Sequence, residues 1–291
     1  MSSAFILTLG PAIKSEVQGF IDKECFEVVN LPPGQHMIPS MWLFKVKPDT
    51  SGNLTIPKAR MVVGSHRQVL NWDCWEFQNY AAVLNCRDNR LMLALAAANK
   101  WTIAQTNISQ AFLEGKLDDA EIYIKPPPGF PCQSGKVLKL RKAVYGLRQA
   151  PVKFKDEVVA WFQANCYSPC NASETIWILR SHCCVIIHTV YVDDFLHFYD
   201  SDHPELYLEF QKAFSARFDT KSDKASLYLG NEIIVDNSKV SLNQKSYTQS
   251  VLEQFGMQDA NTTVKTQLLQ RLDNVSNEIS ASDHVLYRSM V

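Results

Sequence analysis

The sequence predicts an α+β fold, because helical and extended stretches are mixed along its 291 residues without the regular strand–helix alternation of a parallel sheet. Two hairpin patterns carry this prediction. Apolar, β-branched runs flank Tyr191-Val192-Asp193-Asp194, and the alternating run from Met41 to Lys47 returns as Ile56 to Val63. Helix-length runs with apolar residues on one face lie between these hairpins and after them.

The composition is typical of a folded globular chain, with 46% hydrophobic residues, 20% charged residues and a net charge of −1. This balance neither indicates nor excludes a nucleic-acid partner, so any basic surface has to be local. No apolar run is long enough to cross a bilayer, and we expect no membrane partner. The eight cysteines, with no secretory signal before them, are expected to be thiols rather than disulfides.

The elements are expected in the following order. A helix begins at Pro11, a residue suited to the first helical position. Its apolar face is formed by Ile13, Val17, Phe20 and Ile21. Further helices are predicted at residues 89–100, 153–165, 204–214 and 246–255. Strands are predicted at residues 26–29, 41–47, 56–63, 101–105, 121–124, 137–144, 175–179, 184–190, 195–199, 227–234 and 239–242.

The acidic break of the later hairpin is the first candidate site. A two-residue turn favours Gly or Asn, so Asp193-Asp194 is an unusual choice for it. Adjacent carboxylates repel one another, and a divalent cation, most naturally Mg²⁺, would relieve that repulsion. A solvated acidic turn explains the same residues, so the dipeptide alone leaves both interpretations open.

The earlier hairpin gathers positive charge. These residues are either the outward side chains of a two-stranded ribbon or cations that grip phosphates. They are Lys45, Lys47, Lys58 and Arg60.

A group of cysteines and histidines raises the alternative of a zinc module. No CxxC pair is present and Cys183-Cys184 begins an apolar strand, so buried thiols are the better interpretation. The group comprises Cys166, Cys170, His182, Cys183, Cys184 and His188.

Taken together, these segments resemble the reverse transcriptase domain of copia-type retrotransposons, from about Ala12 to the last residue. The resemblance depends on many short motifs in the right order, each of them weak by itself. They include Lys58-Ala59-Arg60-Met61-Val62, Gln105 through Gly115, Val144 through Pro151, Tyr191 through Asp194, Leu229-Gly230-Asn231-Glu232 and Phe255-Gly256-Met257.

The resemblance implies a right-hand polymerase with fingers, a palm built on an antiparallel sheet, and a partial thumb. The expected divisions are residues 1–100 for an N-terminal segment and fingers, 101–125 for the first part of the palm, 126–150 for the fingers–palm junction, 151–235 for the palm with its acidic hairpin, and 236–291 for a truncated thumb. The expected partners are an RNA or DNA primer–template and deoxynucleoside triphosphates. No segment resembles the other enzymes of a retrotransposon polyprotein.

The resemblance also implies roles for particular residues. Two Mg²⁺ ions act in nucleotidyl transfer, and Asp193 and Asp194 are their expected ligands. Nucleotide contacts are expected from Lys58 and Arg60 on the triphosphate, from Phe112 under the sugar, where it excludes a 2′-hydroxyl, and from Gln149. Primer contacts are expected from Leu229, Gly230, Asn231 and Glu232.

The sequence departs from the family at the third carboxylate. Asn107 stands where the family has Asp, and an amide cannot bridge two dications as a carboxylate does. Further departures are Gly64-Ser65-His66 and a longer segment between Asp73 and Val83. We therefore predict either a severely impaired polymerase or an inert, transposon-derived remnant that at most binds RNA or primed duplex.

Overall fold

The computed structural model describes residues 3–45, 58–75, 80–181, 184–236, 239–257 and 259. The chain divides into two compact units, residues 1–243 and 244–291. The described part of the second unit contains the helix α5 (Lys245–Gln254), and all other elements belong to the first. Helices and largely antiparallel sheets are mixed throughout, which confirms the α+β class. The divisions expected within a right-hand polymerase stay a prediction.

A five-stranded sheet, ordered β1-β6-β5-β2-β3, forms one half of the first unit. The pairing of β2 with β5 is parallel, and the other pairings are antiparallel. Its strands are β1 (Phe26–Val29), β2 (Ile38–Lys45), β3 (Lys58–Val63), β5 (Tyr123–Lys125) and β6 (Val137–Leu140). The turn expected between β2 and β3, with Lys47 and Ile56, lies outside the described residues.

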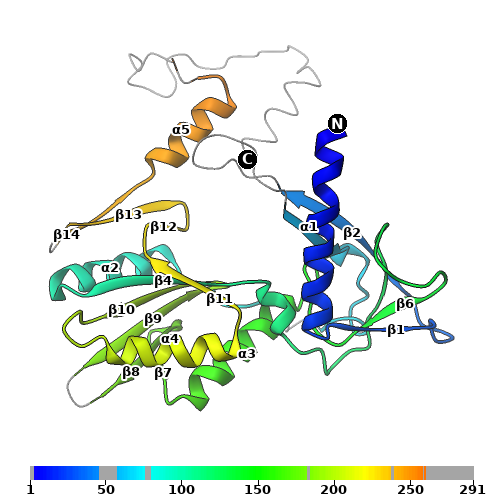
Figure 1. Cartoon of the computed structure of the whole chain (residues 1–291). Helices are drawn as coiled ribbons and strands as arrows, with labels where there is room; N and C mark the ends of the chain where they lie inside the picture. The colour runs from blue at the N-terminus through cyan, green and yellow to red at the C-terminus, as the bar shows by residue number, and fades with distance from the viewer. Residues whose placement is uncertain are drawn as a thin grey trace, which may run out of the picture. The chain divides into compact units, whose positions relative to one another are not determined.

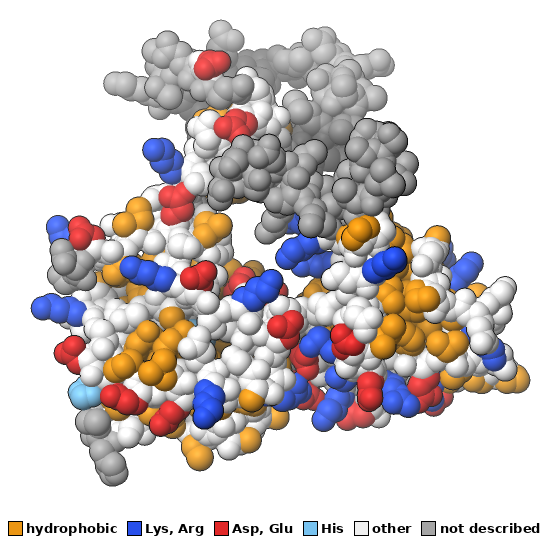
Figure 2. Space-filling model, viewed as in Figure 1, with side chains coloured by type: hydrophobic (Ala, Val, Ile, Leu, Met, Phe, Trp, Pro, Cys, Tyr) orange, Lys and Arg blue, Asp and Glu red, His pale blue; other side chains and the backbone are white. Residues whose placement is uncertain are grey.

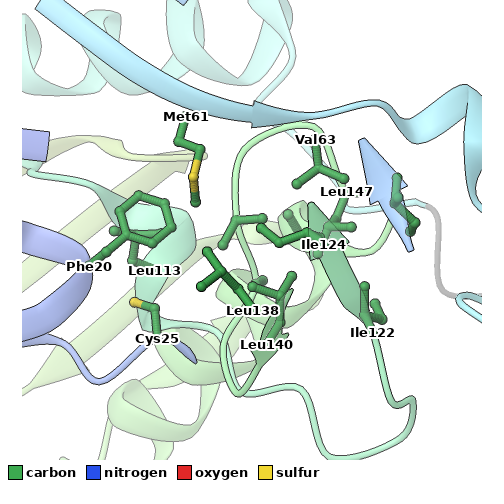
Figure 3. Packing of buried hydrophobic residues seen from close by; sticks show 14 of the residues in the cluster. Phe20, Cys25, Met61, Val63, Leu113, Ile122, Ile124, Leu138, Leu140 and Leu147 are labelled. Carbon is green, nitrogen blue, oxygen red and sulfur yellow. The ribbon is translucent and has the colours of Figure 1, made fainter. Parts of the chain in front are cut away.

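The first helix, α1 (Ser3–Asp22), packs on this sheet. Phe20 of α1, Met61 of β3 and Leu113 lie together in one buried cluster, each with no exposed surface (Figure 3). The helix begins well before the expected Pro11, which lies inside it, so α1 lacks one main-chain hydrogen bond there. Ile21, expected on the buried face, is 49% exposed.

A six-stranded antiparallel sheet, ordered β11-β4-β10-β9-β8-β7, forms the other half. Its strands are β4 (Thr102–Ile108), β7 (Ser168–Cys170), β8 (Ser173–Arg180), β9 (Val185–Tyr191), β10 (Asp194–Tyr199) and β11 (Thr220–Lys224). Helices α3 (Ala150–Ala164) and α4 (Glu205–Arg217) cover one face, and α2 (Cys86–Asn99) covers the other (Figure 1). Two short 3₁₀ turns, η1 (Ser65–Arg67) and η3 (Ala111–Glu114), belong to the links between elements.

The side chains of this sheet alternate between two cores, as the pleat of a strand requires. Phe195 of β10 belongs to the cluster under α3 and α4, and its neighbour Leu196 belongs to the cluster under α2. Both side chains are fully buried. Strands buried on both faces explain why the sequence around the acidic hairpin is continuously apolar.

A three-stranded sheet, β12-β13-β14, packs against α2 and completes the first unit. Its strands are β12 (Leu227–Tyr228), β13 (Asn231–Asp236) and β14 (Lys239–Asn243). Among the described helices, none is both long and apolar enough to span a bilayer. Lys, Arg, Asp and Glu side chains are interspersed on the face seen in Figure 2, in keeping with the net charge near zero.

Candidate active site

The β9–β10 hairpin presents its two acids differently from the sequence prediction. Asp194 already pairs with Tyr191 as the first residue of β10, so the two turn residues are Val192 and Asp193 rather than Asp193 and Asp194. Val192 has φ of 55°, in the left-handed region that a β-branched side chain rarely adopts. Such a conformation costs about 1–3 kcal/mol and is held only by the surrounding structure.

Asn107 lies directly beside these acids. Strand β4 sits between β10 and β11, and its register places Asn107 opposite Asp194. The Asn107 Nδ2 donates a hydrogen bond to Asp194 Oδ1 at 2.8 Å, and Ile108 N donates to Asp193 O at 3.0 Å. The three positions that the family resemblance brings together are therefore contiguous in space.

The environment of Asp193 is partly closed to water. Burial raises the pKa of Asp193 above its usual value, and the Asp194 carboxylate raises it further. A hydrogen bond from the Asn107 amide and the positive charge of Arg60 oppose this increase. The Asn107 amide thus stabilises negative charge on the turn, and Arg60 of β3 is close enough to act on it.

Tyr145 joins Arg60 and Phe112 beside the acids. The Arg60 guanidinium carbon lies 5.1 Å from the centre of the Tyr145 ring, and the Phe112 ring meets Tyr145 edge-on at 5.1 Å. Burial raises the pKa of Tyr145 to about 12, so it stays neutral, while Arg60 opposes the shift. The structure thus connects Arg60 to Phe112, which is half-buried between the two halves of the unit.

Gln149 is buried in the loop that ends at α3, with 1% of its surface exposed. Its Oε1 accepts from Gln68 Nε2 at 2.9 Å, and its Nε2 donates to the Asp73 carbonyl at 2.7 Å. The Gln68 Oε1 in turn accepts from Arg148 N at 2.8 Å. A contact between Gln149 and a nucleotide stays a prediction, and it requires this buried amide pair to open.

The β12–β13 hairpin carries the residues expected to bind a primer. Its turn is formed by Leu229 and Gly230, with φ of 49° and 75°, and Asn231 Nδ2 donates to Leu229 O at 3.0 Å. The preceding Tyr228 brings its hydroxyl to 3.5 Å from the Asp194 carbonyl. Burial raises the pKa of Tyr228. This contact places the hairpin next to the acids.

Residues 23–269 match the sequence family described as reverse transcriptase (RNA-dependent DNA polymerase). The chain belongs to the reverse transcriptase family. This membership confirms the resemblance found in the sequence.

Two curated relatives of this chain come from plant transposons. It is 31% identical over 255 residues to the retrovirus-related Pol polyprotein from transposon TNT 1-94 of Nicotiana tabacum, matching 86% of this chain and 19% of that protein. It is 29% identical over 250 residues to the corresponding polyprotein from transposon RE2 of Arabidopsis thaliana, matching 84% of this chain and 17% of that protein. The chain thus spans about a fifth of the length of these relatives.

Among solved structures, this reverse transcriptase is similar to a foamy viral protease–reverse transcriptase in complex with double-stranded DNA, with a TM-score of 0.41 and 12% identity. The match covers 84% of this chain and 39% of that one. A second structure of the foamy viral protein, in complex with an RNA/DNA hybrid, matches with a TM-score of 0.42 and 12% identity over 84% of this chain and 30% of that one.

The side chains at this candidate site do not fit the pair of Mg²⁺ ions that the family resemblance implies. Asp193 and Asp194 offer hard oxygen ligands, but Asn107 turns an amide donor, not an oxygen, toward Asp194. Within the described ranges, no three His, Cys, Asp or Glu residues gather where they could hold a metal ion.

Sequence reasoning assigned no role to four residues that lie around this candidate site: Tyr145, Tyr228, and the pair Glu16 and Gln110, in which Gln110 Nε2 donates to Glu16 Oε2 at 2.8 Å. Glu16 carries no local signal, since an acid on a helix is an ordinary surface residue. Gln110 lies inside the motif from Gln105 through Gly115, which gave it no role of its own. Tyr145 lies inside the motif from Val144 through Pro151, and Tyr228 directly precedes the motif that begins at Leu229. Only the tertiary contacts place these two residues near Arg60 and Asp194.

Proposed function

We propose that this reverse transcriptase domain performs template-directed DNA synthesis only weakly or not at all, because Asn107 replaces its third carboxylate. The observation that carries the proposal is the hydrogen bond from Asn107 Nδ2 to Asp194 Oδ1 at 2.8 Å. The position filled by the amide is adjacent to both remaining acids, so an Asp there would complete a three-carboxylate cluster.

The expected loss is large. A group that acts mainly on charge in the transition state contributes several kcal/mol, or on the order of a thousandfold in rate. The chain's remaining residues support the binding steps. Arg60 offers positive charge beside the acids, and Phe112 offers an apolar surface for a sugar next to Tyr145. RNA or DNA primer–template and deoxynucleoside triphosphates are the proposed ligands.

Primer extension on an RNA template, with Mg²⁺ or Mn²⁺, tests this proposal. The assay compares the natural chain, Asn107→Asp, and the double variant Asn107→Asp/Asp193→Asn. We expect extension by Asn107→Asp that exceeds that of the natural chain by about a thousandfold, and loss of that gain in the double variant. Equal extension by the natural chain and Asn107→Asp contradicts the proposal.

A second candidate function is nucleic-acid binding without chemistry. The observation that favours it is the cation-bearing end of the β2–β3 ribbon, where Lys45 pairs in register with Lys58 and Leu43 pairs with Arg60. Binding of RNA and of primed duplex, measured at several salt concentrations, should weaken steeply with salt if these cations contact phosphates. Binding with no extension by any variant favours this second function.

A further inference from the structure

Glu16 is a buried acid on α1 that the proposed chemistry does not use. Its side chain is 7% exposed, and burial raises its pKa. One oxygen, Oε1, accepts from Met61 N at 3.3 Å, and the other, Oε2, accepts from Gln110 Nε2 at 2.8 Å. A carboxylate is costly to bury, and this one holds two donors from distant parts of the chain.

Each of the two donors is next to a residue of the nucleotide site. Met61 follows Arg60 on β3. Gln110 is two residues before Phe112 and three after Asn107. It has φ of 50°, and its carbonyl accepts from Leu113 N at 3.0 Å, so it starts the η3 turn that carries Phe112.

Two separate sets of contacts link the strand that carries Arg60 to the turn that carries Phe112. On one side, the Tyr145 ring contacts both Arg60, over its face, and Phe112, edge-on, each at 5.1 Å. On the other side, Glu16 joins the backbone beside Arg60 to the turn before Phe112. The strand and the turn are therefore fixed to each other twice, once through rings and once through a carboxylate.

Gly19 makes room for this contact. A Cβ atom at this position would lie 2.2 Å from Gln110 Oε1, so a side chain there would displace the Gln110 amide. Only a glycine one helical turn after Glu16 lets Gln110 lie against the helix. A glycine inside a helix lowers the stability of the helix by about 1 kcal/mol relative to alanine.

We propose that Glu16 is a positioning residue of the nucleotide site, which fixes the Phe112 turn relative to the Arg60 strand and so sustains the preference for deoxyribonucleotides over ribonucleotides. The inference rests on the proposed function, because Phe112 excludes a 2′-hydroxyl only if the chain binds nucleotides. A purely structural acid would affect unfolding without changing sugar selection.

The test exchanges the two partners. Gln110→Glu places a second carboxylate against Glu16 and breaks the bond, whereas Glu16→Gln/Gln110→Glu restores it with donor and acceptor reversed and keeps an acceptor for Met61 N. Gln18→Glu is the matched control, because Gln18 Nε2 donates to Asp22 Oδ1 at 2.7 Å on the exposed side of the same helix.

The first measurement is hydrogen exchange of the natural chain and these variants, which needs no activity. Loss of a buried hydrogen bond to a charged group should speed exchange by about tenfold or more in residues 58–63 and 108–114 of Gln110→Glu. The double variant Glu16→Gln/Gln110→Glu should return both segments to the exchange rate of the natural chain, and Gln18→Glu should leave that rate unchanged. Uniform acceleration over the whole chain, or no recovery in the exchanged pair, overturns the positioning role.

The second measurement is kcat/KM for a deoxynucleotide relative to the matching ribonucleotide, with Asn107→Asp present in every variant. We expect Gln110→Glu to lower this ratio by about tenfold and the exchanged pair to recover it. If the kcat/KM ratio of deoxynucleotide to ribonucleotide does not change, the inference is wrong, even if hydrogen exchange in the two segments speeds up. If Asn107→Asp itself does not extend a primer, the proposed function and the selection role fail together, while hydrogen exchange still decides whether Glu16 joins the two segments.

Discussion

The Asn107→Asp substitution should destabilise the folded protein when no divalent cation is present. Asn107 Nδ2 donates to Asp194 Oδ1 at 2.8 Å, and an Asp at this position turns that attraction into a contact between two carboxylates. A hydrogen bond to a charged group contributes about 1.5–3 kcal/mol, which is lost. Two unit charges about 4 Å apart repel by about 4 kcal/mol at an effective dielectric constant of about 20.

Proton uptake limits the total cost. Raising the pKa of one carboxyl from about 4 to 7 costs about 4 kcal/mol, after which the repulsion is relieved. We therefore expect a loss of about 4 kcal/mol in the free energy of unfolding at pH 7, which lowers Tm by roughly 8–16 °C in a domain of this size. Mg²⁺ or Mn²⁺ should restore part of this loss in Asn107→Asp, because binding to the folded state stabilises it.

The pH dependence follows from the direction of the pKa shift. Carboxyl groups whose pKa is raised in the folded state destabilise it only above the pKa of the unfolded chain, which is about 4. The difference in stability between the natural chain and Asn107→Asp should therefore be small at pH 4 and grow as the pH rises to 7. Thermal unfolding in EDTA at each pH measures this difference.

Asn85→Asp is the matched control. Asn85 Nδ2 donates to Asp88 Oδ2 at 2.8 Å, the same contact in an exposed position at the start of α2. Water screens the new pair there, and Asp is as good a helix cap as Asn, so we expect a change within about 1 kcal/mol. If Asn107→Asp costs no more than Asn85→Asp in EDTA at pH 7, the electrostatic account of the site is wrong.

Two further predictions concern the scaffold around the site. His188 and His197 are fully buried with their Nδ1 atoms 2.7 Å apart; burial holds the pKa of both far below the usual value, that of His197 at about 3. In the unfolded chain these two histidines take up protons below about pH 6.5, so the free energy of unfolding should fall by up to about 2.7 kcal/mol per pH unit as the pH drops from 6.5 to 4. Replacing both histidines by Phe should flatten this dependence on pH, as measured by urea unfolding. Gly146→Ala should cost at least about 2 kcal/mol in the same assay, because Gly146 has φ of 91° and a Cβ would lie 2.1 Å from Val63 O. Gly135→Ala, at φ of 79° with open space around it, should cost only the backbone strain; equal losses in the two variants contradict the steric argument.

The hairpin that carries the acids could be predicted from the local sequence pattern. The apolar, β-branched runs around residues 191–194 predicted the hairpin, because strands buried on both faces require such side chains. The same pattern misplaced the turn by one residue, because it marked the polar pair Asp193-Asp194 as the break between the apolar runs, whereas tertiary packing holds Val192 in the turn at φ of 55°. The family resemblance identified Asn107 as the departure from the pattern, which no periodicity rule could have found.

The long-range hydrogen bonds of the candidate site could not be predicted from the sequence. Gln149 was expected to face a nucleotide, and its burial depends on Gln68 and Asp73, more than seventy residues away in the chain. Glu16 accepts a hydrogen bond from Gln110, which is 94 residues away in the chain. Such hydrogen bonds carry no signal in a single sequence, because each partner is an ordinary polar residue in its own segment.

The amino-acid order predicted most of the helices and strands and the α+β class, and the family resemblance added the replacement of an acid by an amide at position 107. It did not predict β7 or β11, and it gave residues 227–234 as one strand where the structure has the β12–β13 hairpin. Only the tertiary structure decided that the Asn107 amide nitrogen donates to Asp194 and that Glu16 of α1 accepts from Gln110. Local propensity acts between neighbours in the chain. The register of β4 between β10 and β11, by contrast, is set by packing across the whole sheet, and that register places Asn107 opposite Asp194.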